Sequence, residues 1–286
     1  MMPCGDKQYP LCLLDTNAAS EIVDERFDVF DNFYAWAQAR EPQIVPCFTI
    51  YTLMELRRRP KVFERFVERF QIMPCALVKG YMQLIEEQAA CYPNPSGLDP
   101  CAIAFTFLGD EGNQLKNLPG ILALPDHAAR EVEWNQDEQG IVDGMVSMRS
   151  NYPPDNGTSY TVEEIEHFVW QASFEQLVYH EQEWVSTRLA GDELVEMDAF
   201  PSLKAMLYTV FHKFYADPAR KPERSDGFDV LNASALPFVE AVVTERHQAE
   251  VSRKVQQRDE FLNDLEVFRL VDFRDGVPGT TAKAAT

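Results

Sequence analysis

The chain is poor in positive charge. Its 286 residues include 26 Lys and Arg against 46 Asp and Glu, which gives a formal net charge of −20 and a sequence pI near 4.6. Because phosphate contacts supply most of the non-specific affinity for nucleic acid, this balance disfavours tight, unassisted binding to a polyanion. A few catalytic carboxylates cannot account for the excess. Most of it must lie on solvated faces or on a surface that meets a basic partner.

Long hydrophobic runs are also missing. The longest apolar segments lie around residues 11–14 and 233–243, and both are far shorter than the roughly 20 residues that span a bilayer. The chain does not open with a basic segment followed by an apolar core and a cleavage site, so we expect no secretory signal. We therefore expect a soluble, cytoplasmic protein with no membrane partner.

Cysteine is scarce and scattered. The six cysteines form no Cys-x-x-Cys pair and have no histidine at zinc-ligand spacing: Cys4, Cys12, Cys47, Cys75, Cys91 and Cys101. In a chain expected to be intracellular, this favours reduced thiols. With 45% hydrophobic residues, the chain can bury a sizeable core, as one large domain or as one domain with an insertion.

Short apolar runs near the two ends of the chain predict buried strands. Residues 10–14 form one such run, which ends at Asp15, and residues 239–244 form another, which ends at Glu245. Further strands are predicted over 44–49 and 267–273, and helices over 18–39, 52–59, 226–236 and 246–262. This alternation indicates an α/β fold. Aromatic residues within 30–36 and 211–215 have helical spacing and are expected in the core.

The middle of the chain is mostly helical in pattern. Proline-rich breaks interrupt it, and its clearest element is a helix from about Thr161 to Leu189, where Thr161 and Glu164 form a capping box. We therefore expect 61–199 to be a helical insertion or lid. The core is expected from 1–60 together with 200–275, and 276–286 is expected to be a flexible tail.

Four carboxylates occupy sequence positions that a parallel sheet would bring close together. Asp15 and Glu245 directly follow predicted strands, Glu55 lies in the first turn of a helix, and Asp229 lies near a helix start. In open α/β sheets the ligand site lies outside the carboxyl ends of the strands, so residues far apart in sequence can converge there. Carboxylates packed together without cations repel one another, so such a cluster usually implies a bound metal.

The ligand chemistry points to a hard cation. Oxygen ligands with few competing His or Cys residues favour Mg²⁺ or Mn²⁺ over zinc. One or two such ions could activate water for attack and neutralise charge on a phosphate group and its leaving group. Asp226 lies one helical turn from Asp229 and could share or take its role as a ligand.

Three segments resemble the PIN-domain family of nucleases: Leu13-Leu14-Asp15-Thr16-Asn17, residues 51–56 and residues 225–246. The third is the most specific, because it joins an acid, a small-residue helix, proline, an apolar strand and a Thr-acid pair in the family's order. By this resemblance, Asp15 is the first-strand ligand, Glu55 the helix glutamate, Asp229 the third acid and Glu245 the fourth. The family more often has aspartate at the fourth position, so Glu245 could bind through water.

The resemblance implies a metal-dependent nuclease with a three-layer α/β/α PIN-like core, a central parallel sheet and a mostly helical insertion. It also implies RNA, in preference to DNA, as the nucleic acid partner. Many relatives are toxins or defence effectors, so a toxin-like or antiviral role controlled by a regulatory protein, or a homo-oligomer, is a further expectation. Two alternatives stay open: a catalytically inactive PIN-like interaction module and a DNA-directed nuclease.

Four residues beside the acids are candidates for substrate binding: Asn17, Thr244, Arg57 and Arg224. Simpler interpretations exist for several site residues. Asp15 would also suit a helix N-cap, and Asp226 is a natural cap for the helix that follows it. Glu55 suits the helix dipole, and the arginines suit solvated helix ends.

Overall fold

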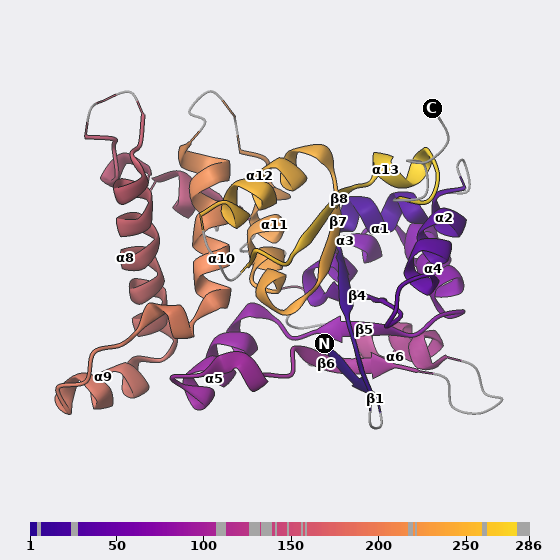
Figure 1. Cartoon of the computed structure of the whole chain (residues 1–286), viewed down its shortest axis with the longest axis horizontal. Helices are drawn as coiled ribbons and strands as arrows, with labels where there is room; N and C mark the ends of the chain where they lie inside the picture. The colour runs from indigo at the N-terminus through magenta and orange to yellow at the C-terminus, as the bar shows by residue number, and fades with distance from the viewer. Residues whose placement is uncertain are drawn as a thin grey trace.

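A six-stranded sheet in the order β6-β5-β4-β3-β7-β8 forms the centre of the protein (Figure 1). Strands β5 and β6 are antiparallel, and the other neighbouring pairs are parallel. The computed structural model describes residues 1–4, 7–23, 28–106, 113–125, 132, 139–140, 142–147, 149–155, 157, 159–216, 220, 222–258 and 262–278.

The strands of this sheet are short. They are β3 (Leu11–Leu14), β4 (Val45–Thr49), β5 (Cys75–Val78), β6 (Cys101–Phe105), β7 (Ala241–Thr244) and β8 (Glu266–Arg269). Strands β1 (Met2–Cys4) and β2 (Lys7–Tyr9) form a separate two-stranded antiparallel sheet.

Helices cover both faces of the sheet. Those from the first half of the chain are α1 (Thr16–Ile22), α2 (Val29–Gln38), α3 (Ile50–Arg57), α4 (Pro60–Phe70), α5 (Tyr81–Cys91) and α6 (Leu118–Leu122). Those from the second half are α8 (Val162–His180), α9 (Gln182–Ala190), α10 (Pro201–Val210), α11 (Asp226–Ala233), α12 (Arg246–Gln256) and α13 (Val271–Arg274). Single turns of 3-10 helix occur at η1 (Pro95–Gly97), η3 (Gln114–Asn117), η4 (Arg149–Asn151), η5 (Met197–Ala199) and η7 (Leu236–Phe238).

Alternating strand residues supply two separate hydrophobic cores. Successive side chains of a strand point to opposite faces, so Leu11 and Leu13 of β3 join one core, while Cys12 and Leu14 join the other. Both sets are buried, as expected for a strand covered on both sides. The protein is therefore an α/β fold with a three-layer α/β/α core, as the sequence predicts.

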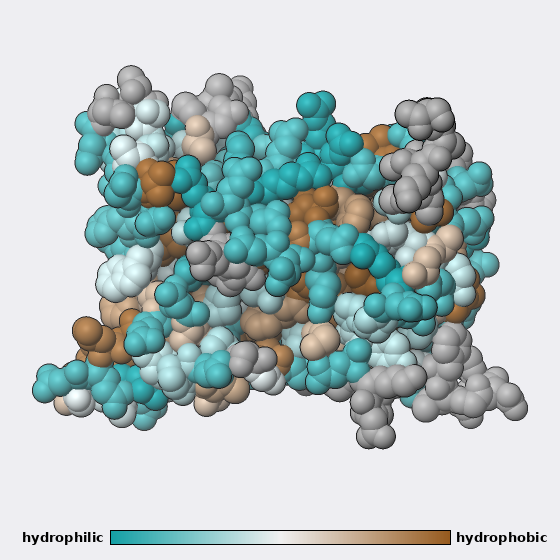
Figure 2. Space-filling view, in the orientation of Figure 1, coloured by the Kyte–Doolittle hydropathy of each residue, from teal (hydrophilic) through white to brown (hydrophobic). Residues whose placement is uncertain are grey.

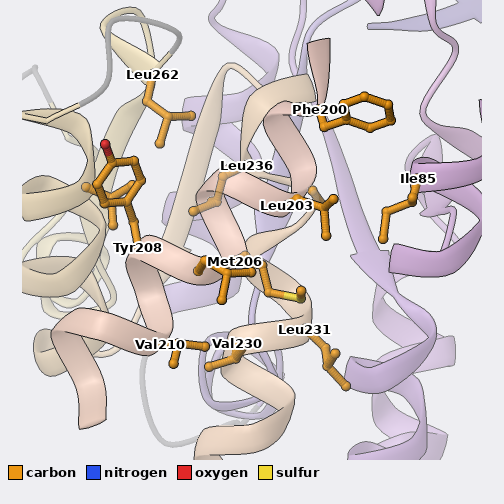
Figure 3. Close-up of a cluster of buried hydrophobic side chains, with 14 of the residues drawn as sticks. Ile85, Phe200, Leu203, Met206, Tyr208, Val210, Val230, Leu231, Leu236 and Leu262 are labelled. Atoms are coloured by element: carbon orange, nitrogen blue, oxygen red, sulfur yellow. The ribbon is translucent and has the colours of Figure 1, made fainter. Parts of the chain in front are cut away.

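Helices α10 and α11 form the centre of the first core. Leu203 and Met206 of α10 lie beside Val230 and Leu231 of α11 (Figure 3). Helices α5, α8 and α12 add further buried residues to the same core. This packing fixes α11, which carries two of the candidate acids.

The second core is rich in aromatic rings. Phe33 and Trp36 of α2 contact Phe273 of α13 at ring-centroid distances of 5.6 and 5.4 Å, and Phe66 of α4 contacts Phe48 of β4 at 5.0 Å. Such edge-on contacts add to the stabilisation from burial. The prediction that the aromatic residues of 30–36 belong to the core is confirmed, and Phe211, Phe214 and Tyr215 are likewise buried in the first core.

The segment 61–199 contributes to the sheet itself. Strands β5 and β6 come from it, and β5 pairs with β4 in the centre of the sheet. The expected boundary at residue 60 is therefore wrong, because short apolar runs in this segment complete the core. Helices α8 and α9 lie at the opposite end of the molecule from α2 and α13 (Figure 1), and α8 begins at the predicted Thr161–Glu164 capping box.

Two other elements differ from those expected from the sequence. The helix expected over 18–39 is divided into α1 and α2, with 24–27 outside the described residues. The strand expected over 267–273 ends with β8, and Phe273 lies instead on the short helix α13, where it packs against α2. Most of the expected tail, 279–286, lies outside the described residues.

The visible surface in Figure 2 is mainly hydrophilic, with hydrophobic residues showing between the polar ones near its centre. Among the described residues, no helix is both long enough and apolar enough to cross a membrane. Cysteines 12, 47, 75, 91 and 101 are unpaired, which agrees with the expected reduced thiols.

Candidate active site

The candidate acids lie at the topological switch point of the sheet, where the strand order reverses. From β3, the sheet extends through β4 and β5 on one side and through β7 and β8 on the other. Asp15 directly follows β3 and Glu245 directly follows β7, while α3, which carries Glu55, begins where β4 ends. In open α/β sheets, ligands bind at this kind of switch point, outside the carboxyl ends of the strands.

Asp15 is held at both carboxylate oxygens. Its Oδ1 accepts a 2.6 Å hydrogen bond from the backbone N–H of Ala18 and caps α1. Its Oδ2 accepts hydrogen bonds from the hydroxyl of Thr244 and from the backbone N–H of Glu245, the latter at 3.3 Å. Asp15 is therefore the predicted helix cap and also a link between β3 and β7.

The environment of Asp15 disfavours its negative charge. The residue is only 5% exposed, and burial together with the charge of Asp229 raises the pKa of Asp15 to about 7, although the hydrogen bonds from Thr244, Ala18 and Glu245 act in the opposite direction. All three donors are neutral. A cation at this position would favour the ionised carboxylate.

The first turn of α1 links Asp15 to two of the other three candidate acids. The hydroxyl of Thr16 donates a hydrogen bond to Oε2 of Glu55, and Nδ2 of Asn17 donates one of 3.1 Å to Oε2 of Glu245. Burial, and next the charge of Asp229, raise the pKa of Glu245. Consecutive residues of one turn therefore contact carboxylates from α3 and from the end of β7.

A lysine that the sequence did not indicate lies among the remaining acids. Lys213 belongs to the π-helix η6 (Phe211–Tyr215), which continues α10, and its side chain is fully buried. Its Nζ donates to Oδ1 of Asp226 at 2.9 Å and to Oδ2 of Asp229. Burial alone would lower the pKa of Lys213, but the two aspartates outweigh it and the pKa is raised.

The contacts of Asp226 are those of a structural ion pair. Besides Lys213, its oxygens accept hydrogen bonds from both terminal nitrogens of Arg220, each at 2.7 Å, and from the backbone N–H of Glu223, also at 2.7 Å. Although burial would raise it, these partners hold the pKa of Asp226 at about 2. A carboxylate offers about four acceptor positions, and all are used here. The predicted role of Asp226 as a metal ligand is not supported, and Asp229 is the better third acid.

The candidate substrate-binding residues are separated in the structure. Thr244 is buried and donates to Asp15, so it positions that carboxylate and cannot reach a substrate. Arg57 donates to the backbone oxygen of Leu122 at 3.2 Å, away from the acids. Arg224 is exposed, and Asn17 is exposed beside Glu245. Asn17 is thus both solvent-accessible and in contact with one of the four acids.

The side chains at this edge fit a hard divalent cation in kind, because they present carboxylate, amide and hydroxyl oxygens without thiols. The positions of these side chains fit a metal ion less well than their chemistry does. Within the part of the chain that the structure describes, no three His, Cys, Asp or Glu side chains lie together as a metal-binding group. Asp229 is turned to Lys213, and Asp15 to Thr244.

A cavity of about 1080 Å³ is bordered by residues of α3 and α11. Its walls include Tyr51, Met54 and Arg57 of α3 and Val230 and Leu231 of α11, and they are mainly apolar. None of the four candidate acids lines it. Near these acids, Asn17 is exposed and Glu245 is partly exposed.

This edge combines three features. Asp15 is held by hydrogen bonds and has a raised pKa, Glu55 and Glu245 add two further carboxylates, and Lys213 forms a buried ion pair with the aspartates of α11. Perturbed carboxylates cluster at functional sites, and structural ion-pair networks also perturb them. Comparison of the chain with protein-family models, with curated proteins and with solved structures finds no match.

Proposed function

We propose that this protein is a divalent-metal-dependent nuclease that hydrolyses phosphodiester bonds at the edge formed by Asp15, Glu55, Asp229 and Glu245. The observation that carries the proposal is the position of Asp15. It is buried at the switch point of the sheet, and it is close enough to Asp229 for that charge to raise its pKa. Burial opposes the ionised form of Asp15 most strongly, and a bound cation would stabilise that form, so we expect the site to attract one.

Each acid has a distinct part in this proposal. Asp15 is fixed by three donors and would orient a bound Mg²⁺ or Mn²⁺. Glu245 is half-buried and linked to the exposed Asn17, so it lies where a phosphate backbone would approach. When bound, the ion would supply an activated water and neutralise charge on the phosphate oxygens. Glu55 is held toward the same edge by Thr16.

RNA is the substrate that we propose, on the basis of the PIN-like segments, and no residue of the site selects RNA over DNA. The net charge of −20 opposes capture of any polyanion. A basic regulatory partner, or assembly with further copies of the chain, would reduce this repulsion. We expect the isolated chain to have weak activity for this reason, which would suit a toxin-like or antiviral role controlled by such a partner.

One observation favours a second candidate, a catalytically inactive interaction module. Asp229 is engaged by Lys213, and among the described residues no three acids form a ready ligand set. A buried ion pair can be retained for structural specificity alone. In that case the acidic edge would be a remnant and would bind no metal.

The test is cleavage of end-labelled single-stranded RNA by the purified chain at low salt, with Mg²⁺, with Mn²⁺ and with excess chelator. We expect cleavage only with metal, and a steep loss as salt increases. Single-stranded DNA of the same sequence, tested in parallel, identifies the preferred nucleic acid. Equal cleavage in excess chelator would refute the metal-dependent mechanism. No cleavage together with no metal binding would favour the interaction module.

A further inference from the structure

The cavity of about 1080 Å³ that α3 and α11 border is too large to be a packing defect. Protein interiors are close-packed, and voids larger than a water molecule are few. Pockets that bind small molecules have volumes of about 300–1,000 Å³. The space beside these two helices therefore has the size of a ligand site.

The inner wall of this cavity consists of buried apolar side chains from α3, α8, α10 and α11. They include Met54, Phe168, Ala172, Met206, Val210 and Val230. Figure 3 shows the part of this wall where α10 and α11 pack together. A wall without hydrogen-bonding groups holds water poorly and accepts apolar atoms. The inner wall therefore fits the apolar body of a ligand.

Polar lining groups are concentrated on α5 and α8. Gln83 and Glu86 come from α5, and Gln176, Tyr179 and His180 come from α8. Gln83 and Glu86 are exposed, and Tyr179 is 79% exposed, so the cavity meets solvent beside them. Ligand pockets commonly combine apolar walls with a few polar groups that fix orientation. The polar end of a ligand would lie at α5 and α8.

The charges around the cavity favour an uncharged ligand. Glu86 and Arg57 are the lining residues with a formal charge in the described part of the chain, and Arg57 donates to the backbone oxygen of Leu122. Burial lowers the pKa of His180, which keeps its ring neutral at pH 7. Glu181 lies near enough to Glu86 for that charge to add to the effect of burial in raising the pKa of Glu181. An anion would meet these two carboxylates, and a cation would find no acid on the inner wall described above.

We propose that this cavity is a binding site for an uncharged, mainly apolar small molecule. The apolar body of the ligand packs against α3, α10 and α11, and its polar group faces α5 and α8. None of the four candidate acids lines the cavity. Binding there requires neither a metal ion nor cleavage.

The first experiment titrates the full-length chain with phenylnaphthylamine, an uncharged probe whose fluorescence increases in an apolar environment. We expect saturable binding, and a thermal midpoint that rises with probe concentration because the ligand binds the folded chain. Anilinonaphthalene sulfonate has the same rings and one negative charge, and it should bind at least about ten-fold more weakly. Equal or tighter binding of the sulfonate would overturn the assignment to an uncharged ligand. Binding of neither probe would overturn the site.

The second experiment fills the cavity with a larger side chain. Ala172→Phe adds a ring at a lining position of α8, and Val210→Phe adds one at a lining position of α10. Ala90→Phe is the matched control, because Ala90 of α5 is exposed and lies outside the described lining. We expect Ala172→Phe to bind phenylnaphthylamine at least about ten-fold more weakly, and Ala90→Phe to bind it as the wild type does. Unchanged binding by a folded Ala172→Phe chain would overturn the proposal.

Thermal unfolding of the same variants tests whether the space exists in solution. Ala205 of α10 is fully buried and lies outside the described lining, so Ala205→Phe should overpack the core and lower the thermal midpoint. Ala172→Phe should lower it less, because the cavity accommodates the ring. If Ala172→Phe alone fails to fold, binding by Val210→Phe decides. Failure of both variants to fold would show that the space is already filled, and would overturn the proposal.

Discussion

The hydroxyl of Thr244 donates a hydrogen bond to Oδ2 of Asp15, although the two residues lie 229 positions apart in the chain. Thr244 ends β7 and Asp15 follows β3, and these strands are parallel neighbours in the sheet. The bond holds a carboxylate whose charge is opposed by burial and by Asp229. It therefore links the fold directly to the electrostatics of the candidate site.

Replacing Thr244 with valine should weaken this link without changing the shape of the side chain. We expect a loss of about 1–3 kcal/mol in unfolding free energy at pH 8, because a buried acceptor loses its donor. The pKa of Asp15 should rise further, and the pH at which cleavage reaches half its maximum should rise with it. Urea denaturation and a pH–rate profile measure the two effects.

Thr209→Val is the matched control for this change. Its hydroxyl is also buried, but it donates to the backbone oxygen of Ala205 at 2.8 Å. We expect Thr209→Val to reduce stability while leaving the pH–rate profile in place. An unchanged profile for Thr244→Val would show that this hydroxyl does not control the ionisation of Asp15.

Asp15→Asn should stabilise the metal-free protein at high pH. The pKa of Asp15 is about 7 in the folded chain, against 3.8 for an unperturbed aspartate, so the folded state binds this proton more tightly. Ionisation of Asp15 therefore costs little stability below pH 4, increasing amounts between pH 4 and 7, and a constant amount above pH 7. At about 1.4 kcal/mol per pKa unit, less about 1 kcal/mol for a weakened hydrogen bond, we expect a gain of about 2–4 kcal/mol at pH 8.

The same variant should show no gain at pH 4, where the wild-type carboxyl is already mostly protonated in the folded chain. Urea denaturation of both proteins at pH 4 and pH 8, in the presence of chelator, tests this. If Asp15→Asn is less stable than wild type at both pH values, the hydrogen bonds of Asp15 outweigh its charge and the residue is mainly a helix cap.

The two aspartates of α11 should respond differently to replacement by asparagine. Asp226 pairs with both Lys213 and Arg220, so Asp226→Asn removes the carboxylate that Arg220 contacts and one of the two that Lys213 contacts, and it should cost about 3 kcal/mol or more. Asp229→Asn leaves Lys213 paired with Asp226, so its stability should fall less while cleavage is lost. Thermal unfolding and cleavage assays on both variants separate these effects. Equal stability losses would contradict the structural role assigned to Asp226.

The strands that carry Asp15 and Glu245 could be predicted from the sequence because each is an apolar run that ends in an acid. The alternation of such runs with helical patterns also indicated an α/β fold, and the PIN-like segments implied its three layers. Strand β5 was missed because its four residues, Cys75–Val78, are buried on both faces and show no alternation. Its membership of the sheet depends on pairing with β4 and β6, which no local pattern encodes.

The positive charge of the site, on Lys213, could not be predicted from the sequence. Lys213 lies within an aromatic run that is typical of a core helix, and a single lysine there gives no indication of its partners. Its contacts with α11 depend on the π-helical turn and on the return of the chain to α11. A lysine within an apolar run is nevertheless a usable signal, because a buried ammonium requires an acid nearby.

The most direct test of the account is single-turnover cleavage of end-labelled RNA by wild-type and Asp15→Asn chains at equal concentration in Mn²⁺. Asp198→Asn replaces an exposed aspartate and serves as the control. We predict that Asp15→Asn, verified as folded, cleaves more than about 100-fold more slowly, beyond the loss usual for residues outside the ligand shell. The control should retain the wild-type rate. A folded Asp15→Asn chain that cleaves at the wild-type rate would contradict the central claim.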